Sequence, residues 1–457
     1  MRVWPCFLVI ALGFAEFTPL QASDTQTIEA GIAARNITPR GPIWLAGYAA
    51  RNKPSEQVDS PLMVQAVALR SPPGDPVVLV SIDNCEVSRE LTGPVIQSLA
   101  AKHGLGPGRV MIVSSHTHSA PVVHGPLHGM YFLSSTNAEA VAEYGCFLQT
   151  QLTEVVGAAL QDLRPAQLEH GTGQTRFAIN RRVVLADRVV IGENFDGPVD
   201  WDVPVLSIRG ATNDLRGIVF GYACHGTSVA GEDFYTVCGD YMAYARQQLE
   251  AVYPGAVTAF LTGMGADSNP YPRGRLLNAK RHGLELAGAV SSVLGRPMRS
   301  VRGQLRFAYA ELELPLVPHP PREQLEADAQ NKDVYIQQRA KAYLEKLNRG
   351  ETPADSVQLP MSVLRLGDDL TFCAIGGEVV VDYAIRLKRL LAADHPWCIG
   401  YAYEVPCYIP SIHILKEGGY EPDSSLIYYG LYGPFQTKIE DLIVSKMTEL
   451  ARSARGQ

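Results

Sequence analysis

Two histidines spaced two residues apart, His116 and His118, stand in the segment Ser114-Ser115-His116-Thr117-His118-Ser119. They follow the apolar run 110–113, which predicts a strand that ends at a polar edge. Residues two apart on an extended backbone point to the same side, so both imidazoles should face one spot. Neutral imidazole nitrogen is a good ligand for zinc, and the pair therefore predicts a metal site. Two histidines that only form hydrogen bonds are the simpler alternative.

A second predicted strand also ends on a histidine. The apolar run 217–223 is followed by Cys224-His225-Gly226-Thr227-Ser228. In open α/β sheets, ligands bind at the edge where such strands end. Zinc takes three or four protein ligands, so one or two more must come from elsewhere in the chain.

These motifs resemble those of the neutral/alkaline (non-lysosomal) ceramidase family, specifically its catalytic domain. The segment 116–121 is similar to the family's first histidine motif, and 225–228 to its HPTS-like motif with glycine in place of proline. Gly376-Gly377-Glu378 resembles a PGE-type turn before a helix, and Tyr408-Ile409 followed by Tyr420-Glu421 resembles its YI…YE segment. The resemblance implies a Zn²⁺ ion bound by His116, His225, Glu378 and Tyr408.

The same resemblance implies roles for residues around the metal. His118 and Tyr420 would help to stabilise the oxyanion, and Arg181, in an Asn-Arg pair typical of the family, would lie near the active site. The segment 265–270 resembles the family's GDVSPN segment, but its aspartate comes one place later and Asn-Pro replaces Pro-Asn. The role of Ser268 therefore stays open between attacking the carbonyl and orienting a metal-bound water. With the elements at 36–39 and 45–48, the resemblance covers roughly residues 30 to 435.

The resemblance implies an exported zinc-dependent amidohydrolase that cleaves the N-acyl bond of a small amphiphilic or lipid amide, such as a ceramide, by metal-activated water. Two alternatives remain: a zinc esterase or deacylase acting on another acylated substrate, and a noncatalytic descendant that binds a ligand. Enzymes of the family carry an immunoglobulin-like domain after the catalytic part. About 35 residues follow Glu421, fewer than the roughly 100 of such a sandwich, so we expect no such domain here.

The elements expected to position these residues form an α/β fold of layered mixed sheets flanked by helices, because apolar strands alternate with helical segments from residue 31 to about 314. A charged helical insertion is predicted within residues 318–360, as helices over 322–330 and 334–348. It is either a lid or partner surface, or simply a solvated insertion. The expected strands are 64–69, 77–83, 109–114, 203–208, 217–223 and 370–375, and the expected helices are 91–103, 138–163, 241–252, 278–294 and one ending at 391.

The composition limits the possible partners and compartment. A net charge of -7 without any cluster of Lys and Arg argues against nucleic-acid binding. Arg2, the apolar stretch 6–14 and Leu20-Gln21-Ala22 before Ser23 predict a signal peptide over residues 1–22, with a buried N-terminal segment as the alternative. Residues 23–457 would then form one exported hydrolase domain, secreted or periplasmic. We expect no transmembrane anchor; peripheral membrane contact and the oligomeric state stay open.

Two further expectations concern the surroundings of His225. Asp240 is a candidate partner for its ring, since zinc-bound histidines need a carboxylate or a carbonyl partner. Cys224 and Cys407 adjoin His225 and Tyr408 and are expected to be small buried residues. Seven of the eight cysteines follow the predicted signal peptide without any CxxC spacing, so a cysteine-rich structural zinc site is not expected.

Overall fold

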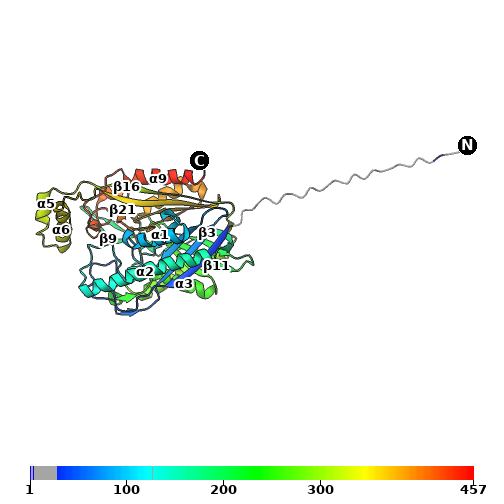
Figure 1. The fold of residues 1–457 in the computed structure, drawn as a ribbon, viewed down its shortest axis with the longest axis horizontal. Helices are drawn as coiled ribbons and strands as arrows, with labels where there is room; N and C mark the ends of the chain where they lie inside the picture. The colour runs from blue at the N-terminus through cyan, green and yellow to red at the C-terminus, as the bar shows by residue number, and fades with distance from the viewer. Residues whose placement is uncertain (2–3, 5–27, 126, 457) are drawn as a thin grey trace.

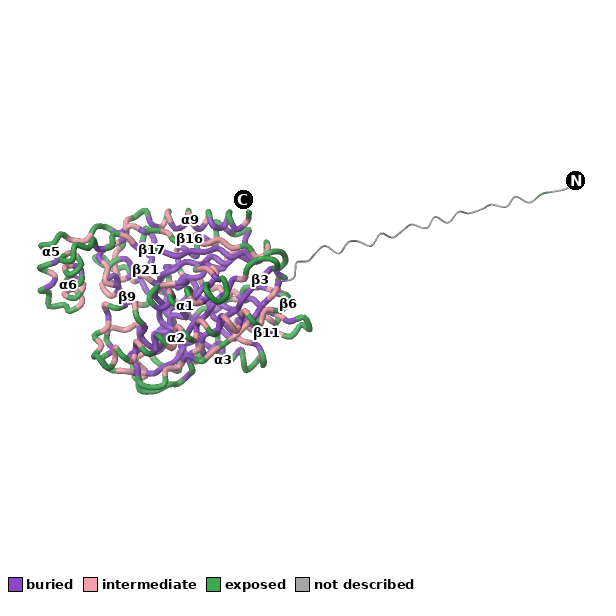
Figure 2. Tube along the Cα trace, in the orientation of Figure 1, coloured by how far each residue is buried: buried purple, intermediate pink, exposed green. Residues whose placement is uncertain are grey.

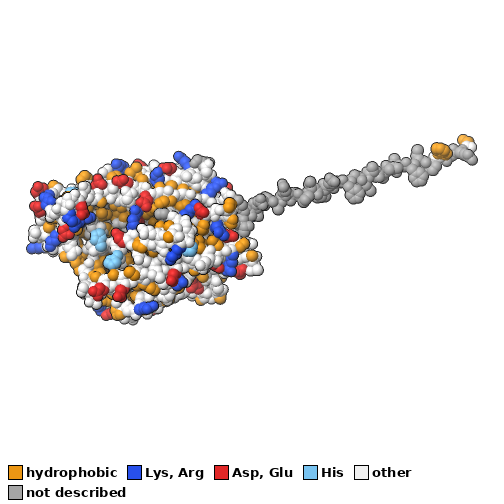
Figure 3. All heavy atoms as spheres, viewed as in Figure 1, with side chains coloured by type: hydrophobic (Ala, Val, Ile, Leu, Met, Phe, Trp, Pro, Cys, Tyr) orange, Lys and Arg blue, Asp and Glu red, His pale blue; other side chains and the backbone are white. Residues whose placement is uncertain are grey.

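The structure is a computed structural model that describes residues 1, 4, 28–125 and 127–456. The predicted signal peptide, residues 1–22, lies outside the described residues except for Met1 and Trp4. None of the described helices is both long enough and apolar enough to span a bilayer. Acidic and basic side chains are interspersed over the face seen in Figure 3, which shows no large basic patch.

The first sheet has the order β5-β4-β3-β1-β6, with β4 parallel to β5 and the other main pairs antiparallel. All residues of β4 and β5 are buried, which is why both read as continuous apolar runs in the sequence. The strands are β1 (Glu29–Asn36), β3 (Met63–Arg70), β4 (Val77–Ile82), β5 (Val110–Ser114) and β6 (Arg164–Pro165).

The second sheet, of order β13-β11-β10-β7-β15, packs face to face on the first. Leu79 and Val113 of the first sheet share one apolar core with Val219 and Leu261 of the second. The strands are β7 (Gln167–Gln174), β10 (Asp202–Arg209), β11 (Leu215–Tyr222), β13 (Val257–Thr262) and β15 (Arg299–Ser300). Because β5 and β11 belong to stacked sheets, the two histidine motifs that follow them lie close together.

Helices cover the outer face of each of these sheets, so the body has four layers (Figure 1). Helices α1 (Arg89–His103) and α2 (Ser135–Gln161) cover the first sheet, and α3 (Asp240–Val252) and α4 (Leu276–Leu294) cover the second. Ser88 and Ser134 cap the first two helices by accepting from backbone N–H groups. The strands between these layers are largely buried (Figure 2).

A third sheet and three small ones complete the body. The third, of order β16-β17-β18-β20, is covered by α9 (Ile439–Ser453), and α7 (Val381–Leu390) packs on its edge strand β20. Its strands are β16 (Leu305–Pro315), β17 (Ser356–Leu366), β18 (Leu370–Ile375) and β20 (Pro396–Ile399). The small sheets pair β8 (Ala178–Val184) with β9 (Val189–Asn194) and β14 (Ser268–Pro270), β19 (Glu378–Val379) with β21 (Tyr408–Ile409), and β2 (Gln57–Val58) with β12 (Thr236–Val237). The predicted layered α/β class is confirmed.

The predicted helical insertion is present as α5 (Arg322–Asp328) and α6 (Val334–Asn348), which project at one end of the molecule (Figure 1). Leu325 and Tyr343 form a small core of their own with Tyr432, and the Arg339 guanidinium lies 3.9 Å from the centre of the Tyr432 ring. A short helix, α8 (Ile412–Glu417), and four 3-10 turns, Pro107–Arg109, Gly231–Asp233, Ala392–Asp394 and Ser424–Ile427, link the remaining elements.

Candidate active site

His116 and His118 converge through a bend in the chain. The strand β5 ends at Ser114, and His116 has a φ of 60° in the left-handed region. We expected the two side chains to face one spot because residues two apart on an extended strand point the same way. That reason is wrong, because the backbone is no longer extended at His116. Both rings are buried, with their Nε2 atoms 3.1 Å apart.

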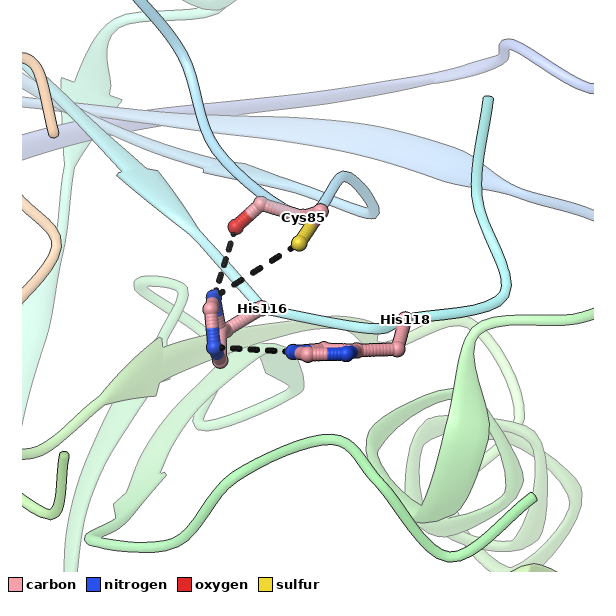
Figure 4. A group of neighbouring side chains, drawn as sticks. All are labelled: Cys85, His116 and His118. Carbon is pink, nitrogen blue, oxygen red and sulfur yellow. Dashed lines mark hydrogen bonds between the residues drawn. The ribbon is translucent and has the colours of Figure 1, made fainter. Parts of the chain in front are cut away.

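A carbonyl group fixes which ring nitrogen of His116 faces the site. Its Nδ1 lies 2.9 Å from the backbone oxygen of Cys85 and donates to it, which leaves the Nε2 lone pair free for a metal. Cys85 Sγ is on that same Nδ1 edge, at 3.9 Å, while His118 lies at the opposite edge (Figure 4). The thiol is therefore on the wrong side of the ring to share a metal with Nε2.

His225 enters the site directly beside this motif. Thr117 and Gly226 form a parallel bridge, and the His118 N–H donates to the Gly226 carbonyl at 2.9 Å. The His225 Nδ1 atom lies 3.3 Å from the Gly265 carbonyl. The expectation for Asp240 is wrong: its carboxylate accepts from the Ser228 N–H at 2.9 Å, and a backbone carbonyl faces the His225 ring instead.

Two short strands deliver the other candidate ligands. Glu378 and Tyr408 are directly paired in the parallel ladder of β19 and β21, so their side chains emerge side by side. Gly377 before them has a φ of +82°, which favours glycine. The hydroxyl groups of Tyr401 and Tyr429 lie 3.2 Å from Oε2 and 2.8 Å from Oε1 of Glu378 respectively, and orient the carboxylate.

The spacing of these ligand atoms fits a tetrahedral zinc ion. Bonds of ~2.0–2.2 Å at tetrahedral angles place ligand atoms ~3.3 Å apart. Glu378 Oε2 is 3.2 Å from the Nε2 atoms of both His116 and His225, and the Tyr408 hydroxyl is 3.2 Å from His225 Nε2. The residues present could therefore hold Zn²⁺ without rearranging the backbone.

The electrostatics of the cluster also suit a cation. Burial lowers the pKa of His225 to about 3, so the ring is neutral and its lone pair is available. Burial alone would raise the pKa of Glu378, but His116 and His225 hold it well below its usual range. Burial raises the pKa of Tyr408 well above its ordinary value despite the nearby Arg181 guanidinium. Tyr408 is therefore a phenol that only a bound metal would convert to phenolate.

Arg181, on strand β8, and Tyr420 lie beside the candidate metal ligands. Its buried guanidinium lies 3.1 Å from the Tyr408 hydroxyl and 3.0 Å from His225 Nε2, and donates to Glu421 at 2.8 Å. Tyr420 is half-buried and packs edge-on against Tyr408, with ring centres 5.5 Å apart. Its hydroxyl has no hydrogen-bond partner among the described residues, so it is free to donate to a substrate.

Ser268 lies beside the cluster but contributes through its backbone. Its carbonyl accepts the His225 N–H at 3.0 Å, and β14 pairs it with Asn180. The Ser268 hydroxyl is buried and has no hydrogen-bond partner within the described residues. His124 and His128 lie at the rim of a separate cavity. Cys224 and Cys407 are buried, as expected.

Glu86, which the sequence analysis missed, is linked to the candidate ligand Glu378 through the Tyr429 hydroxyl. The Tyr429 hydroxyl lies 2.8 Å from Oε1 of both Glu86 and Glu378. The single proton of the Tyr429 hydroxyl cannot be donated to two carboxylates, so one of the two must be protonated. Burial and the charge of Glu378 raise the pKa of Glu86 well above its usual range. Glu86 is therefore the protonated group. A polar segment directly after the buried strand β4 was the available signal.

Comparisons with known proteins identify the family and the fold. The family described as neutral/alkaline non-lysosomal ceramidase, N-terminal, matches residues 29–268. No curated protein sequence matches the chain. A structure titled "Ceramidase complexed with C2" is 17% identical, with a TM-score of 0.70 over 94% of this chain and 76% of that one. Neutral ceramidase from Pseudomonas aeruginosa is 18% identical, with a TM-score of 0.70 over 93% and 75%. At this identity, the two structures establish the shared fold.

Proposed function

Because the chain belongs to the neutral/alkaline non-lysosomal ceramidase family, we propose that it is a zinc-dependent amidohydrolase that cleaves the N-acyl bond of ceramide or a related lipid amide. The observation that carries this proposal is the buried set of His116, His225, Glu378 and Tyr408, in which three ligand-atom separations are 3.2 Å, close to the ~3.3 Å between atoms bound to one zinc ion. When bound there, zinc would polarise the amide carbonyl and lower the pKa of a water molecule to about 7.

The surrounding residues supply hydrogen bonds and charge. Burial and the neighbouring histidines lower the pKa of His118 well below its usual range, so its ring is neutral. Since His116 Nε2 carries a lone pair, His118 Nε2 holds the proton between them. A metal that takes this lone pair would leave the His118 N–H free to donate to a substrate. The free Tyr420 hydroxyl is a second donor. One well-placed donor to a developing oxyanion contributes ~3–4 kcal/mol in the transition state.

Arg181 contacts two of the proposed metal ligands, Tyr408 and His225. It donates to Tyr408, which stabilises the phenolate oxygen, and its pairing with Glu421 keeps the guanidinium in place. We favour water over Ser268 as the nucleophile, since the Ser268 carbonyl fixes His225 while its hydroxyl makes no hydrogen bond to a ligand residue. The N-terminal sequence supports our further proposal that the enzyme is exported.

The test is hydrolysis of a short-chain fluorescent ceramide, with an ester of the same acyl chain as the competing substrate. We expect amide cleavage, and a loss of at least about a thousandfold in kcat/KM in His116→Ala and His225→Ala, because losing the metal removes several kcal/mol of stabilisation. His128→Ala is the matched control, since His128 lies outside the cluster. Ester cleavage without amide cleavage would replace the amidase by the esterase alternative.

A further inference from the structure

A cleft of about 520 Å³ lies between β7 and β10 on one side and α7 and β20 on the other. It is separate from the proposed metal ligands, none of which lines it. Its lining includes Ala223 and Gly263, which precede His225 and Gly265 by two residues each. The cleft therefore adjoins the strand ends that carry the active site, from the opposite side.

One end of the cleft carries the Arg299 guanidinium, while the Asp369 carboxylate acts on the neighbouring His170. Arg299 of β15 is paired across the strands with His170 of β7, and its guanidinium contacts His395 Nε2. The His170 and His395 rings lie 6.1 Å apart. Within the part of the chain that the structure describes, Arg299 forms no ion pair with an acidic side chain. This end is therefore suited to an anion.

His170 carries an unpartnered polar atom at the same end. The residue is only 9% exposed, and its buried Nε2 atom has no hydrogen-bond partner among the described residues. A buried polar atom without a partner is unfavourable, and natural structures leave few of them. Because His170 lines the cleft, a ligand there can supply the missing partner.

The other end of the cleft is acidic, and its wall is partly apolar. The Lys388 ammonium is held there by Asp200 and Asp202, each at 2.7 Å, so two carboxylates face one cation. Pro204, Pro297 and Pro396 line the cleft with apolar rings that are at least partly exposed. The cleft thus offers one unsatisfied cationic end and an apolar surface beside it.

We propose that this cleft binds a small amphiphilic carboxylate, with its carboxylate held by Arg299, His170 and His395 and its apolar body along Pro204, Pro297 and Pro396. The planar guanidinium fork matches a carboxylate in geometry and charge. The volume is within the range of small-molecule sites in proteins. Binding of the carboxylate in this cleft does not depend on hydrolysis at the proposed metal centre.

Binding should depend on pH through His170. Burial, together with His395 and Arg299, lowers the pKa of His170, and the nearby Asp369 acts in the opposite direction. The ring is therefore neutral in the free protein at neutral pH. A bound carboxylate beside Nε2 favours the protonated ring, so binding takes up a proton and becomes tighter as the pH falls from 8 to 6.5.

Calorimetric titration of the full, zinc-loaded protein with decanoate tests the site directly. We expect saturable binding that is stronger at pH 6.5 than at pH 8 and at least tenfold weaker in Arg299→Gln. Arg296→Gln is the matched control: it removes the same charge three residues away, from a side chain that contacts Ser292 and does not line the cleft. Both arginines are exposed, so neither variant should fail to fold.

Three outcomes would overturn the proposal. Decanoate binding that is unchanged in Arg299→Gln would exclude the cationic end, and binding lost in His116→Ala but kept in Arg299→Gln would place the carboxylate at the metal centre. Inorganic phosphate that binds as tightly as decanoate would exclude the apolar wall as a determinant. Calorimetry reads these outcomes whether or not the protein hydrolyses ceramide, so failure of this proposal and failure of the proposed function are distinguishable.

Discussion

Tyr408 and Tyr420 lie in contact, yet their surroundings assign them different tasks. The Tyr408 hydroxyl lies within hydrogen-bond distance of His225 and Arg181, while the Tyr420 hydroxyl has no hydrogen-bond partner in the described structure. We therefore predict that Tyr408→Phe loses zinc affinity by at least tenfold, whereas Tyr420→Phe keeps its zinc and loses about a hundredfold or more in kcat. Chelator competition and steady-state kinetics measure the two effects. Full zinc affinity in Tyr408→Phe would remove this residue from the ligand set.

Gly47 controls the position of His118. It has a φ of +91°, and a Cβ atom there would collide with the His118 ring. We predict that Gly47→Ala lowers kcat about ten- to hundredfold with unchanged zinc content, because His118 moves while the metal ligands stay. Gly41→Ala is the control, since a Cβ at Gly41 meets open space. If Gly47→Ala keeps the wild-type kcat, His118 does not act on the substrate.

At the scale of elements, strand β8 is anchored through a buried carboxylate. Glu421 lies between Arg181, at 2.8 Å, and Arg182, at 2.5 Å, and all three side chains are buried. Removing the charge of Glu421 leaves two buried guanidinium groups without their shared partner.

We predict that Glu421→Gln lowers the free energy of unfolding by about 3–5 kcal/mol. Glu417→Gln should cost about 1 kcal/mol or less, because the Glu417 side chain is 33% exposed and contacts only Arg182 of the pair. Urea unfolding of both variants measures the difference. Equal losses in the two variants would mean that Glu421 does not anchor the strand.

The main elements were predictable from the sequence because their apolar runs are long and buried on both faces, as in β4, β5 and β11. The finer geometry of the site was not. The left-handed backbone at His116, which converges the histidines, is a local conformation that no periodicity encodes. Asp240 was the wrong partner for the His225 ring because a backbone carbonyl fills this place, and every residue type has one. Glu86 was missed because a lone carboxylate has no motif.

At the scale of the whole molecule, the candidate ligands join parts of the chain that are far apart. His116 follows a strand of the first sheet and His225 one of the second, while Glu378 and Tyr408 come from the two-stranded sheet of β19 and β21. A ligand that binds only the folded state stabilises it by about 4 kcal/mol at a thousand times its Kd. We therefore predict that chelation lowers the melting temperature of the whole body in calorimetry. An unchanged melting temperature after verified zinc removal would contradict a metal that links these sheets.

The most direct measurement is the X-ray absorption spectrum at the zinc edge of the purified protein. Two ligand sets share His116: the set with His225, Glu378 and Tyr408 contains only nitrogen and oxygen, while the neighbouring group of Cys85, His116 and His118 contains sulfur. Zinc–sulfur bonds are ~2.3 Å and zinc–nitrogen or –oxygen bonds ~2.0–2.2 Å, so the spectrum separates them. We predict one zinc per chain with a first shell made only of nitrogen and oxygen atoms, from the four side chains and a water molecule. A sulfur scatterer, or no bound zinc, would contradict the proposed centre.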